Sequence, residues 1–173
     1  MGTGDAPHPR EQRSDAARNH EALVRAATAA LHREGPRVSL ATIAAEAEMV
    51  RQAVATWLGE GIVAQEIGLF VRTPQLVARA RAAIAGLAGA DKIVTAPMNL
   101  AKGLEFRAVV VMACDEGTLP LDERVADAAD EAELDDIYET ERQLLYVACT
   151  RAREHLLLTG ITPTSEYLAD FTS

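Results

Sequence analysis

Apolar side chains recur at every third or fourth position in the first third of the chain, which is the spacing of amphipathic helices. Gly35 and Pro36 interrupt this pattern, and Ser39 then stands as an N-cap candidate before the next apolar series. A second break is expected after Ala47. The pattern therefore predicts three short helices within residues 13–58, built on these positions: Leu23, Ala27, Ala30 and Leu31; Ile43, Ala44 and Ala47; Val50, Val54, Trp57 and Leu58.

From about residue 58 onward the pattern changes to short apolar runs that alternate with helical stretches. It predicts strands at residues 66–72, 93–96, 108–113 and 156–159, a helix from Thr73-Pro74 to Gly89, a long helix over 131–153 and a helical turn at 165–171. Such alternation favours right-handed crossovers and a parallel sheet. The expected fold class is therefore α/β, with a partial parallel sheet and flanking helices, preceded by the small three-helix segment.

The chain of 173 residues allows one domain with a small appendage. We expect a disordered tail over residues 1–12, a helical segment over 13–58 and the α/β part over 59–173. The longest apolar runs, such as residues 108–114, are far below the roughly 20 residues that span a bilayer, and the N-terminus lacks the pattern of a signal peptide. The sequence thus predicts a cytoplasmic protein with no membrane partner.

Charge is unevenly distributed along the chain. Residues 1–58 hold seven basic and seven acidic side chains, whereas residues 59–173 hold ten basic and nineteen acidic ones. An acidic part binds phosphate backbones poorly without a local basic groove. The two cysteines, Cys114 and Cys149, lack metal-ligand spacing, and the acidic run from Asp122 to Glu141 lacks the spacing of a calcium loop. We therefore expect two buried thiols and no metal site.

Two phrases beside strand-like runs carry most of the functional information. They are Lys102-Gly103-Leu104-Glu105-Phe106 and Tyr146-Val147-Ala148-Cys149-Thr150-Arg151-Ala152-Arg153. In this order and with this spacing they resemble the last two conserved motifs of the UvrD/Rep/PcrA superfamily 1 DNA helicases. The resemblance covers about residues 57–173 and implies the C-terminal RecA-like domain of such an enzyme.

The resemblance implies that one side of this domain contacts the nucleotide. Arg151 corresponds to the arginine finger that reaches the γ-phosphate across the cleft between two RecA-like lobes, a task suited to a planar fork that stays charged. Glu105 approaches the nucleotide ribose, and Tyr146 lies on the same nucleotide-binding side. Lys102, Glu105 and Arg151 should then lie on one side of the sheet, at the ligand edge of an open α/β fold.

The resemblance also implies a DNA side. Lys102 helps to hold the loop that faces DNA, and Arg72 matches the arginine of a DNA-contacting motif. The family usually has Thr-x-His just before the first phrase, where this chain has Pro97-Met98-Asn99. Asn99 can still donate to a phosphate, whereas Pro97 has neither a hydroxyl nor an N–H to offer.

The sequence also lacks parts of a complete ATP site. A phosphate loop of the form G-x-x-x-x-G-K-[ST] needs a lysine after a glycine, but the only lysines, Lys92 and Lys102, follow Asp91 and Ala101. ATP and Mg²⁺ are therefore implied by the family only. We expect a truncated helicase C-terminal domain that does not hydrolyse ATP alone and whose partners are single-stranded DNA and a helicase N-terminal nucleotide-binding lobe.

A second resemblance concerns the N-terminal helices. Residues 13–47 are similar to the helix-turn-helix of TetR-type repressors, through the phrases at 18–23, 34–40 and 43–47. This alternative implies a DNA-binding transcriptional regulator whose recognition helix would present Arg51, Gln52 and Thr56 to a groove. The family has a glycine in the turn after Ala47, where this chain has Glu48. A fusion product without a selected function is the third alternative.

Overall fold

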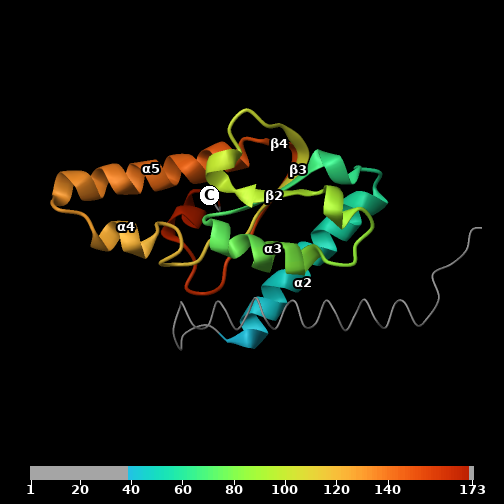
Figure 1. Cartoon of the computed structure of the whole chain (residues 1–173), viewed down its shortest axis with the longest axis horizontal. Coiled ribbons are helices and arrows are strands. Elements are labelled where there is room, and N and C mark those ends of the chain that lie inside the picture. The colour runs from blue at the N-terminus through green and yellow to red at the C-terminus, as the bar shows by residue number, and fades with distance from the viewer. Residues whose placement is uncertain (1–38, 172–173) are drawn as a thin grey trace, which may run out of the picture.

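The computed structural model describes residues 39–171, and its centre is a four-stranded parallel sheet (Figure 1). The strands are β1 (Ile67–Val71), β2 (Val94–Pro97), β3 (Phe106–Val111) and β4 (Ala152–Leu158), in the spatial order β2-β1-β3-β4. Each neighbouring pair is parallel. The predicted α/β class with a parallel sheet is thus confirmed. The predicted tail at 1–12 and the first predicted helix lie outside the described residues.

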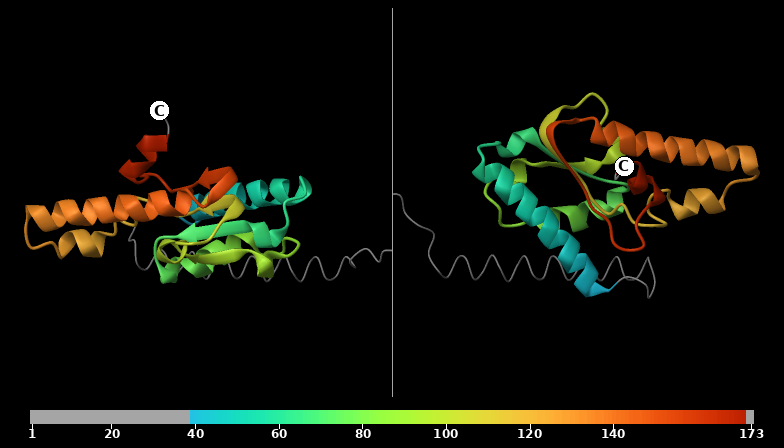
Figure 2. Two further views of the ribbon diagram at one scale, coloured as in Figure 1. Left: turned by 90° about the horizontal axis from the view of Figure 1, so that it is seen from above. Right: turned by 180° about the vertical axis from the view of Figure 1, so that it is seen from behind.

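Helices cover both faces of this sheet (Figure 2). On one face lie α2 (Leu40–Gly59) and α3 (Val77–Ile84), and on the other lies α5 (Glu131–Cys149), with the short α4 (Asp122–Ala126) beside it. Single turns of 3₁₀ helix join the larger elements, at Ala64–Glu66, Pro74–Leu76, Ala90–Lys92, Met98–Leu100 and Glu166–Phe171. Between residues 39 and 171 no helix is both long and apolar enough to cross a membrane.

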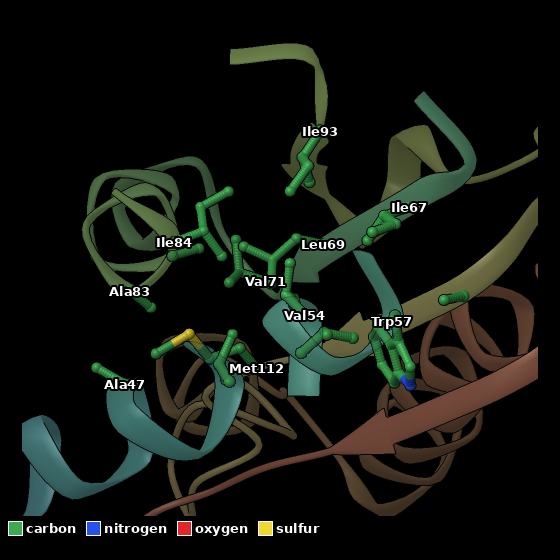
Figure 3. Packing of buried hydrophobic residues seen from close by; sticks show 14 of the residues in the cluster. Ala47, Val54, Trp57, Ile67, Leu69, Val71, Ala83, Ile84, Ile93 and Met112 are labelled. Carbon is green, nitrogen blue, oxygen red and sulfur yellow. The ribbon is translucent and has the colours of Figure 1, made fainter. Parts of the chain in front are cut away.

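The two faces of the sheet form two separate hydrophobic clusters. The α2 and α3 face buries Val54, Trp57, Leu69, Ile84 and Met112 among others (Figure 3). The α5 face is a second cluster that includes Phe70, Val109 and Leu145. Every residue of β1, and nearly every residue of β3, is buried. This burial on both sides explains why these strands are almost continuously apolar rather than alternating.

The predicted pair of short helices at residues 40–58 is wrong, because α2 is a single helix of 20 residues. Ser39 caps it as expected, since its hydroxyl accepts the N–H of Thr42 at 3.2 Å. No glycine or proline interrupts residues 40–58, and Glu48 does not break the helix. The apolar positions of both predicted helices continue in one register and face the sheet, at Ile43, Ala47, Val50, Val54 and Trp57.

Other boundaries also differ from the prediction, including those of β3, which spans Phe106–Val111 instead of 108–113. The helix expected from Pro74 to Gly89 begins as a 3₁₀ turn and ends at Ile84. The long helix ends at Cys149 instead of residue 153, and β4 begins at Ala152 instead of 156. The cause is a contact that follows the helix immediately: the N–H of Phe106 donates to the carbonyl of Arg151 at 2.9 Å. The chain therefore joins the sheet as soon as α5 ends.

Candidate nucleotide-facing site

The loop from Met98 to Glu105 connects the carboxyl end of β2 to the amino end of β3. Met98 and Ala101 are buried and anchor it, whereas Asn99, Lys102 and Glu105 are exposed. Gly103 has a φ of 81°, a left-handed conformation that favours glycine. The loop thus has a buried base and exposes both polar and apolar side chains. Among residues 39–171 no ion pair is formed by Lys102 or Glu105.

The C-terminal end of α5 lies directly beside this loop. Arg151 donates from Nε to the carbonyl of Val147 at 3.1 Å and from Nη1 to the carbonyl of Leu104 at 3.3 Å. Its Nη2 donates to the hydroxyl of Thr150 at 3.1 Å. Every acceptor is a neutral oxygen, so no carboxylate neutralises Arg151 in these contacts. Tyr146, one turn earlier on the helix, is 63% exposed.

The structure therefore brings part of the predicted site together. Arg151 contacts the residue next to Glu105, and Lys102 and Asn99 belong to the same loop. These residues form the motif edge, which we define as residues 98–105 together with 146–151. Glu105 and Arg151 lie at the amino ends of β3 and β4, which they directly precede, whereas Asn99 follows the carboxyl end of β2.

Open parallel sheets commonly bind their ligands at the carboxyl ends of the strands, and Glu105 and Arg151 lie at the amino ends of β3 and β4. The carboxyl ends of β1, β3 and β4 instead surround a cavity of about 700 Å³, lined among others by Arg72, Asp115, Gly117 and Thr162. Neither Glu105 nor Arg151 lines it. Glu105 and Arg151 thus lie at the other end of β3 and β4 from this carboxyl edge.

Arg72 lies at the carboxyl edge, directly after β1. Its Nε and Nη2 each donate to a different carboxylate oxygen of Glu141, both at 2.5 Å. Arg124 of α4 donates to the same carboxylate at 2.6 Å. The side chain of Arg72 is only 13% exposed, and that of Glu141 is fully buried. The guanidinium of Arg72, which the sequence suggested as a DNA contact, is thus bound to a carboxylate inside the protein.

Glu141 is an important residue whose partners the sequence did not reveal. Burial alone would raise its pKa, but the hydrogen bonds from Arg72 and Arg124 outweigh this effect and hold the pKa below its ordinary value. The position of Glu141 among the apolar residues of the long predicted helix could have indicated that its side chain is buried. A glutamate in the buried register of a helix needs a cationic partner.

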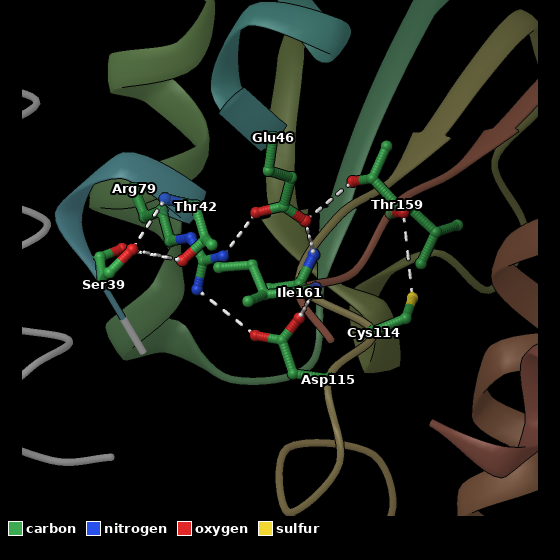
Figure 4. Close-up of polar contacts among 10 residues, drawn as sticks. Ser39, Thr42, Glu46, Arg79, Cys114, Asp115, Thr159 and Ile161 are labelled. Carbon is green, nitrogen blue, oxygen red and sulfur yellow. Dashed lines mark hydrogen bonds and ion pairs between the residues drawn. The ribbon is translucent and has the colours of Figure 1, made fainter. Parts of the chain in front are cut away.

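A second buried group of charges connects α2 and α3 to the carboxyl edge (Figure 4). The carboxylate of Glu46 accepts from the N–H of Ala113 at 3.0 Å, from the hydroxyl of Thr159 at 2.9 Å and from Arg79. Asp115 accepts from Arg79 at 3.4 Å and from the N–H of Ile161 at 2.5 Å. Nothing in the sequence pattern indicated these pairings, because the partners are far apart along the chain.

Neither edge offers a complete set of metal ligands. Among residues 39–171 no group of three histidine, cysteine, aspartate or glutamate side chains is arranged to hold a metal ion. Both cysteines are buried, and burial raises the pKa of the Cys149 thiol to about 12. The motif edge offers a cation, a carboxylate and an exposed aromatic ring. A single carboxylate there is not a set of ligands for Mg²⁺.

The fold and the motif edge together define the class of protein: a parallel α/β lobe that presents an arginine and a charged loop at one end of its sheet. Comparison with known proteins gives the family. The family described as the UvrD-like helicase C-terminal domain matches residues 40–162. This chain belongs to that family. The match begins at the first residue of α2, so residues 40–59 are part of the helicase-like domain, and the TetR resemblance is not supported.

Individual relatives agree with this assignment. YjcD of Bacillus subtilis, described as a candidate ATP-dependent DNA helicase, is 46% identical over 63 residues, which are 35% of this chain and 8% of YjcD. The ATP-dependent DNA helicase UvrD2 of Mycobacterium tuberculosis is 41% identical over 66 residues, or 38% of this chain and 9% of UvrD2. The chain thus matches less than a tenth of each relative's length.

A solved structure is also similar. The crystal structure of the C-terminal domain of a possible DNA helicase from Lactobacillus plantarum aligns with a TM-score of 0.49 and 22% sequence identity. The alignment covers 72% of this chain and 71% of that structure.

Proposed function

We propose that this domain provides the arginine-bearing face of a superfamily 1 helicase ATP site and part of a path for single-stranded DNA. The nucleotide would lie between the motif edge and a separate lobe that carries the phosphate loop and binds Mg²⁺. In this arrangement Arg151 contacts the γ-phosphate, Glu105 the ribose, and Tyr146 the nucleotide from the side of α5.

The observation that carries this proposal is the environment of Arg151. Its guanidinium lies at the end of α5, beside the loop that holds Glu105, and it contacts only carbonyl and hydroxyl oxygens. An incoming phosphate would therefore replace neutral acceptors with an anion, which strengthens the hydrogen bonds. The arginines at the carboxyl edge lack this property, because buried carboxylates already bind Arg72 and Arg79.

For the DNA side, we propose Asn99 and Lys102 as contacts to the phosphate backbone. Both are exposed on the motif loop, and no acidic side chain is paired with Lys102 among the described residues. We leave Arg72 out of the proposed path, because its guanidinium is already bound to the carboxylate of Glu141. Two isolated polar groups on an acidic protein predict weak, salt-sensitive binding.

A second lobe is needed because positioning and neutralisation of the phosphates depend on a phosphate loop and Mg²⁺. The motif edge has a surface suited to such a lobe. Leu100 and Tyr146 are 59% and 63% exposed there, and Leu104, whose carbonyl accepts from Arg151, is 37% exposed. Exposed apolar residues around a charged centre are typical of an interface.

The test combines the whole chain with a separately produced nucleotide-binding lobe of PcrA from Bacillus subtilis, another relative that is 40% identical over 72 residues. ATP hydrolysis is measured with Mg²⁺ and single-stranded DNA for each component and for the mixture. We expect no turnover from the chain alone and a stimulated rate in the mixture.

Two outcomes would contradict the proposal. One is ATP hydrolysis by the chain alone that elutes with the protein on a final sizing column. The other is a mixture that forms a complex, detected by sedimentation, but hydrolyses ATP no faster than the PcrA lobe by itself. In the same assay, Arg81→Ala is the matched control for Arg151→Ala. Arg81 is also an exposed arginine, but it lies on α3, on the other face of the sheet from α5.

A further inference from the structure

The cavity at the carboxyl edge carries an excess of negative charge. Its charged lining residues are one arginine and four carboxylates: Arg72, Asp115, Glu116, Asp122 and Glu123. The guanidinium of Arg72 is already bound to Glu141, which lies outside the lining. The volume of about 700 Å³ is within the range of roughly 300–1,000 Å³ that ligand pockets have. The cavity therefore has the size of a ligand site and the charge of a cation site.

Three of these carboxylates have no cationic partner within residues 39–171. They are Glu116, Asp122 and Glu123, which we call the rim carboxylates. Asp122 is held over the cavity turn, because its N–H donates to the carbonyl of Gly117 at 2.9 Å. Its carboxylate folds back so closely that a Cβ on Gly117 would lie 2.6 Å from Oδ2. Like charges that share a cavity repel each other, and a cation between them removes that cost.

The buried carboxylates of the same edge show how this fold neutralises acidic groups. Glu141 is bound by Arg72 and Arg124, and Glu46 is bound by Arg79. In each case an arginine from a distant part of the chain supplies the positive charge. These three arginines are all bound to carboxylates that lie outside the rim. The rim carboxylates thus resemble the buried ones but lack the arginine.

A largely buried hydroxyl also opens on the cavity. Thr118 lines the cavity and is 7% exposed. In the part of the chain that the structure describes, its hydroxyl has no hydrogen-bond partner, although solvent still reaches it. Polar side chains buried to this degree are normally hydrogen-bonded, so this hydroxyl is available to accept from a guest. Leu121 and Ile161 supply apolar lining, which suits the methylene groups of a long basic side chain.

We propose that this cavity binds an arginine side chain presented by a basic segment of another protein. A guanidinium carries five N–H donors in a planar fork, so it can bind carboxylates and a hydroxyl together. A metal ion is a poorer match, because within residues 39–171 no three suitable ligand side chains converge. A phosphate-bearing guest is disfavoured by the charge of the rim.

The acidic surface extends beyond the cavity, which favours a protein segment over a small cation. Asp122 and Glu123 begin α4, and α4 lies beside α5 on the arm that projects from the sheet (Figure 1). The first part of α5 exposes five further carboxylates: Glu131, Glu133, Asp135, Asp136 and Glu139. A negative field of this extent attracts a segment with several basic residues and guides one of them to the cavity.

The experiment titrates the whole chain with two synthetic peptides and follows backbone amide shifts by NMR at low ionic strength. One peptide has three arginines separated by glycines. The other has citrulline at those positions, which keeps the shape and removes the charge. The arginine peptide should shift the amides of residues 115–123 and 161–162, with a Kd of roughly 0.1–1 mM. The citrulline peptide should bind at least about tenfold more weakly.

Variants separate entry into the cavity from attraction to the whole acidic surface. Glu116→Gln removes one rim charge and should weaken the arginine peptide about three- to tenfold. Thr118→Val removes the hydroxyl and should weaken it about threefold. Asp135→Asn is the matched control, because it removes one exposed charge from α5 outside the cavity; it should change the affinity less than about twofold. If Thr118→Val does not fold, Glu116→Gln and the two peptides still decide the matter.

Four results would overturn the inference. Equal binding of the arginine and citrulline peptides would mean that the cavity does not select a cation. Equal weakening by Glu116→Gln and Asp135→Asn would mean that the peptide follows the general field. Spermidine that binds the same residues as tightly as the arginine peptide would identify a small polycation as the guest. Absence of any shift at about 1 mM arginine peptide would mean that no such site exists. None of these measurements involves ATP hydrolysis, so they leave the proposed function untouched.

Discussion

The motif edge and the carboxyl edge use charged residues in opposite ways. At the motif edge, Lys102 and Glu105 are exposed and Arg151 contacts only neutral oxygens. At the carboxyl edge, Glu46, Arg79 and Glu141 are buried and bound to oppositely charged partners. Glu105 and Arg151 lie at one end of β3 and β4, and the buried charges lie near the other end. The difference therefore comes from the surrounding helices and loops and not from the sheet itself.

This difference separates recognition from stability. A charge that is paired inside the protein stabilises the fold only while its partner remains, because an uncompensated buried charge is costly. A charge that contacts neutral acceptors at the surface contributes little to stability but remains available to a ligand. Substitutions at the motif edge should therefore change activity, and substitutions of the buried charges at the carboxyl edge should change folding.

The largest expected effect is that of Arg151→Ala on ATP hydrolysis in the mixture with the PcrA lobe. Loss of an arginine finger costs roughly 10³-fold or more in rate. The free energy of unfolding should change by less than about 0.5 kcal/mol, as for other surface substitutions. Steady-state kinetics and urea denaturation measure the two quantities. A variant that loses activity and stability together would remove the distinction between the edges.

The next effect is that of Glu46→Ala on stability. The substitution leaves Arg79 buried with only the longer contact to Asp115, and it removes the acceptor for Ala113 and Thr159. We expect a loss of about 3–5 kcal/mol in the free energy of unfolding. Glu48→Ala, on the exposed side of the same helix, is the control and should change stability by less than about 0.5 kcal/mol. Equal losses in both variants would contradict the role of the buried charges.

A smaller effect concerns pH and Glu141. Its pKa is lowered in the folded state from the ordinary value of 4.5. Its contribution to stability is therefore complete above that value and is lost as the pH falls through the folded pKa. Glu141→Gln should cost about 2 kcal/mol at pH 7, and the difference from the unaltered chain should shrink below about pH 4.5. Urea denaturation of both proteins from pH 7 to pH 3 measures it. A difference that is constant with pH would refute the charge pairing.

The smallest effect is expected for Tyr146→Ala. The ring is largely exposed, so stability should not change measurably. The apparent affinity for ATP in the mixture should fall by about three- to tenfold, as for the loss of one aromatic contact. Tyr138→Ala provides a contrast, because Tyr138 packs edge-on against Tyr167 and belongs to the core on the α5 face. Tyr138→Ala should lower the stability of the fold and have little direct effect on the apparent affinity for ATP.

Much of the fold could be predicted because it depends on local patterns. The apolar runs at 66–72 and 108–113 overlap the central strands β1 and β3, and the helix predicted at 131–153 contains α5, which ends at Cys149. The two motif phrases also led to the family that the comparison gives. Each of these features is encoded within a few neighbouring residues, where periodicity and turn residues act directly.

The remaining features depended on contacts between distant residues. Whether α2 breaks after Ala47 was decided by the sheet, which buries one continuous apolar stripe from Ile43 to Trp57. The partner of Arg72 is 69 positions away, and that of Glu46 at Thr159 is 113 positions away. No local pattern determines such pairings, because they exist only once the crossovers have placed the ends of the strands together.

The sequence by itself thus determined the kinds of elements, the parallel direction of the strands and the residues of the two motifs. The tertiary structure decided which charges remain available and at which end of the sheet they lie. Arg72 and Arg151 have the same chemistry and each adjoins a strand of this sheet. One is neutralised because the fold places Glu141 beside it in a buried site, and the other stays available because only neutral oxygens surround it.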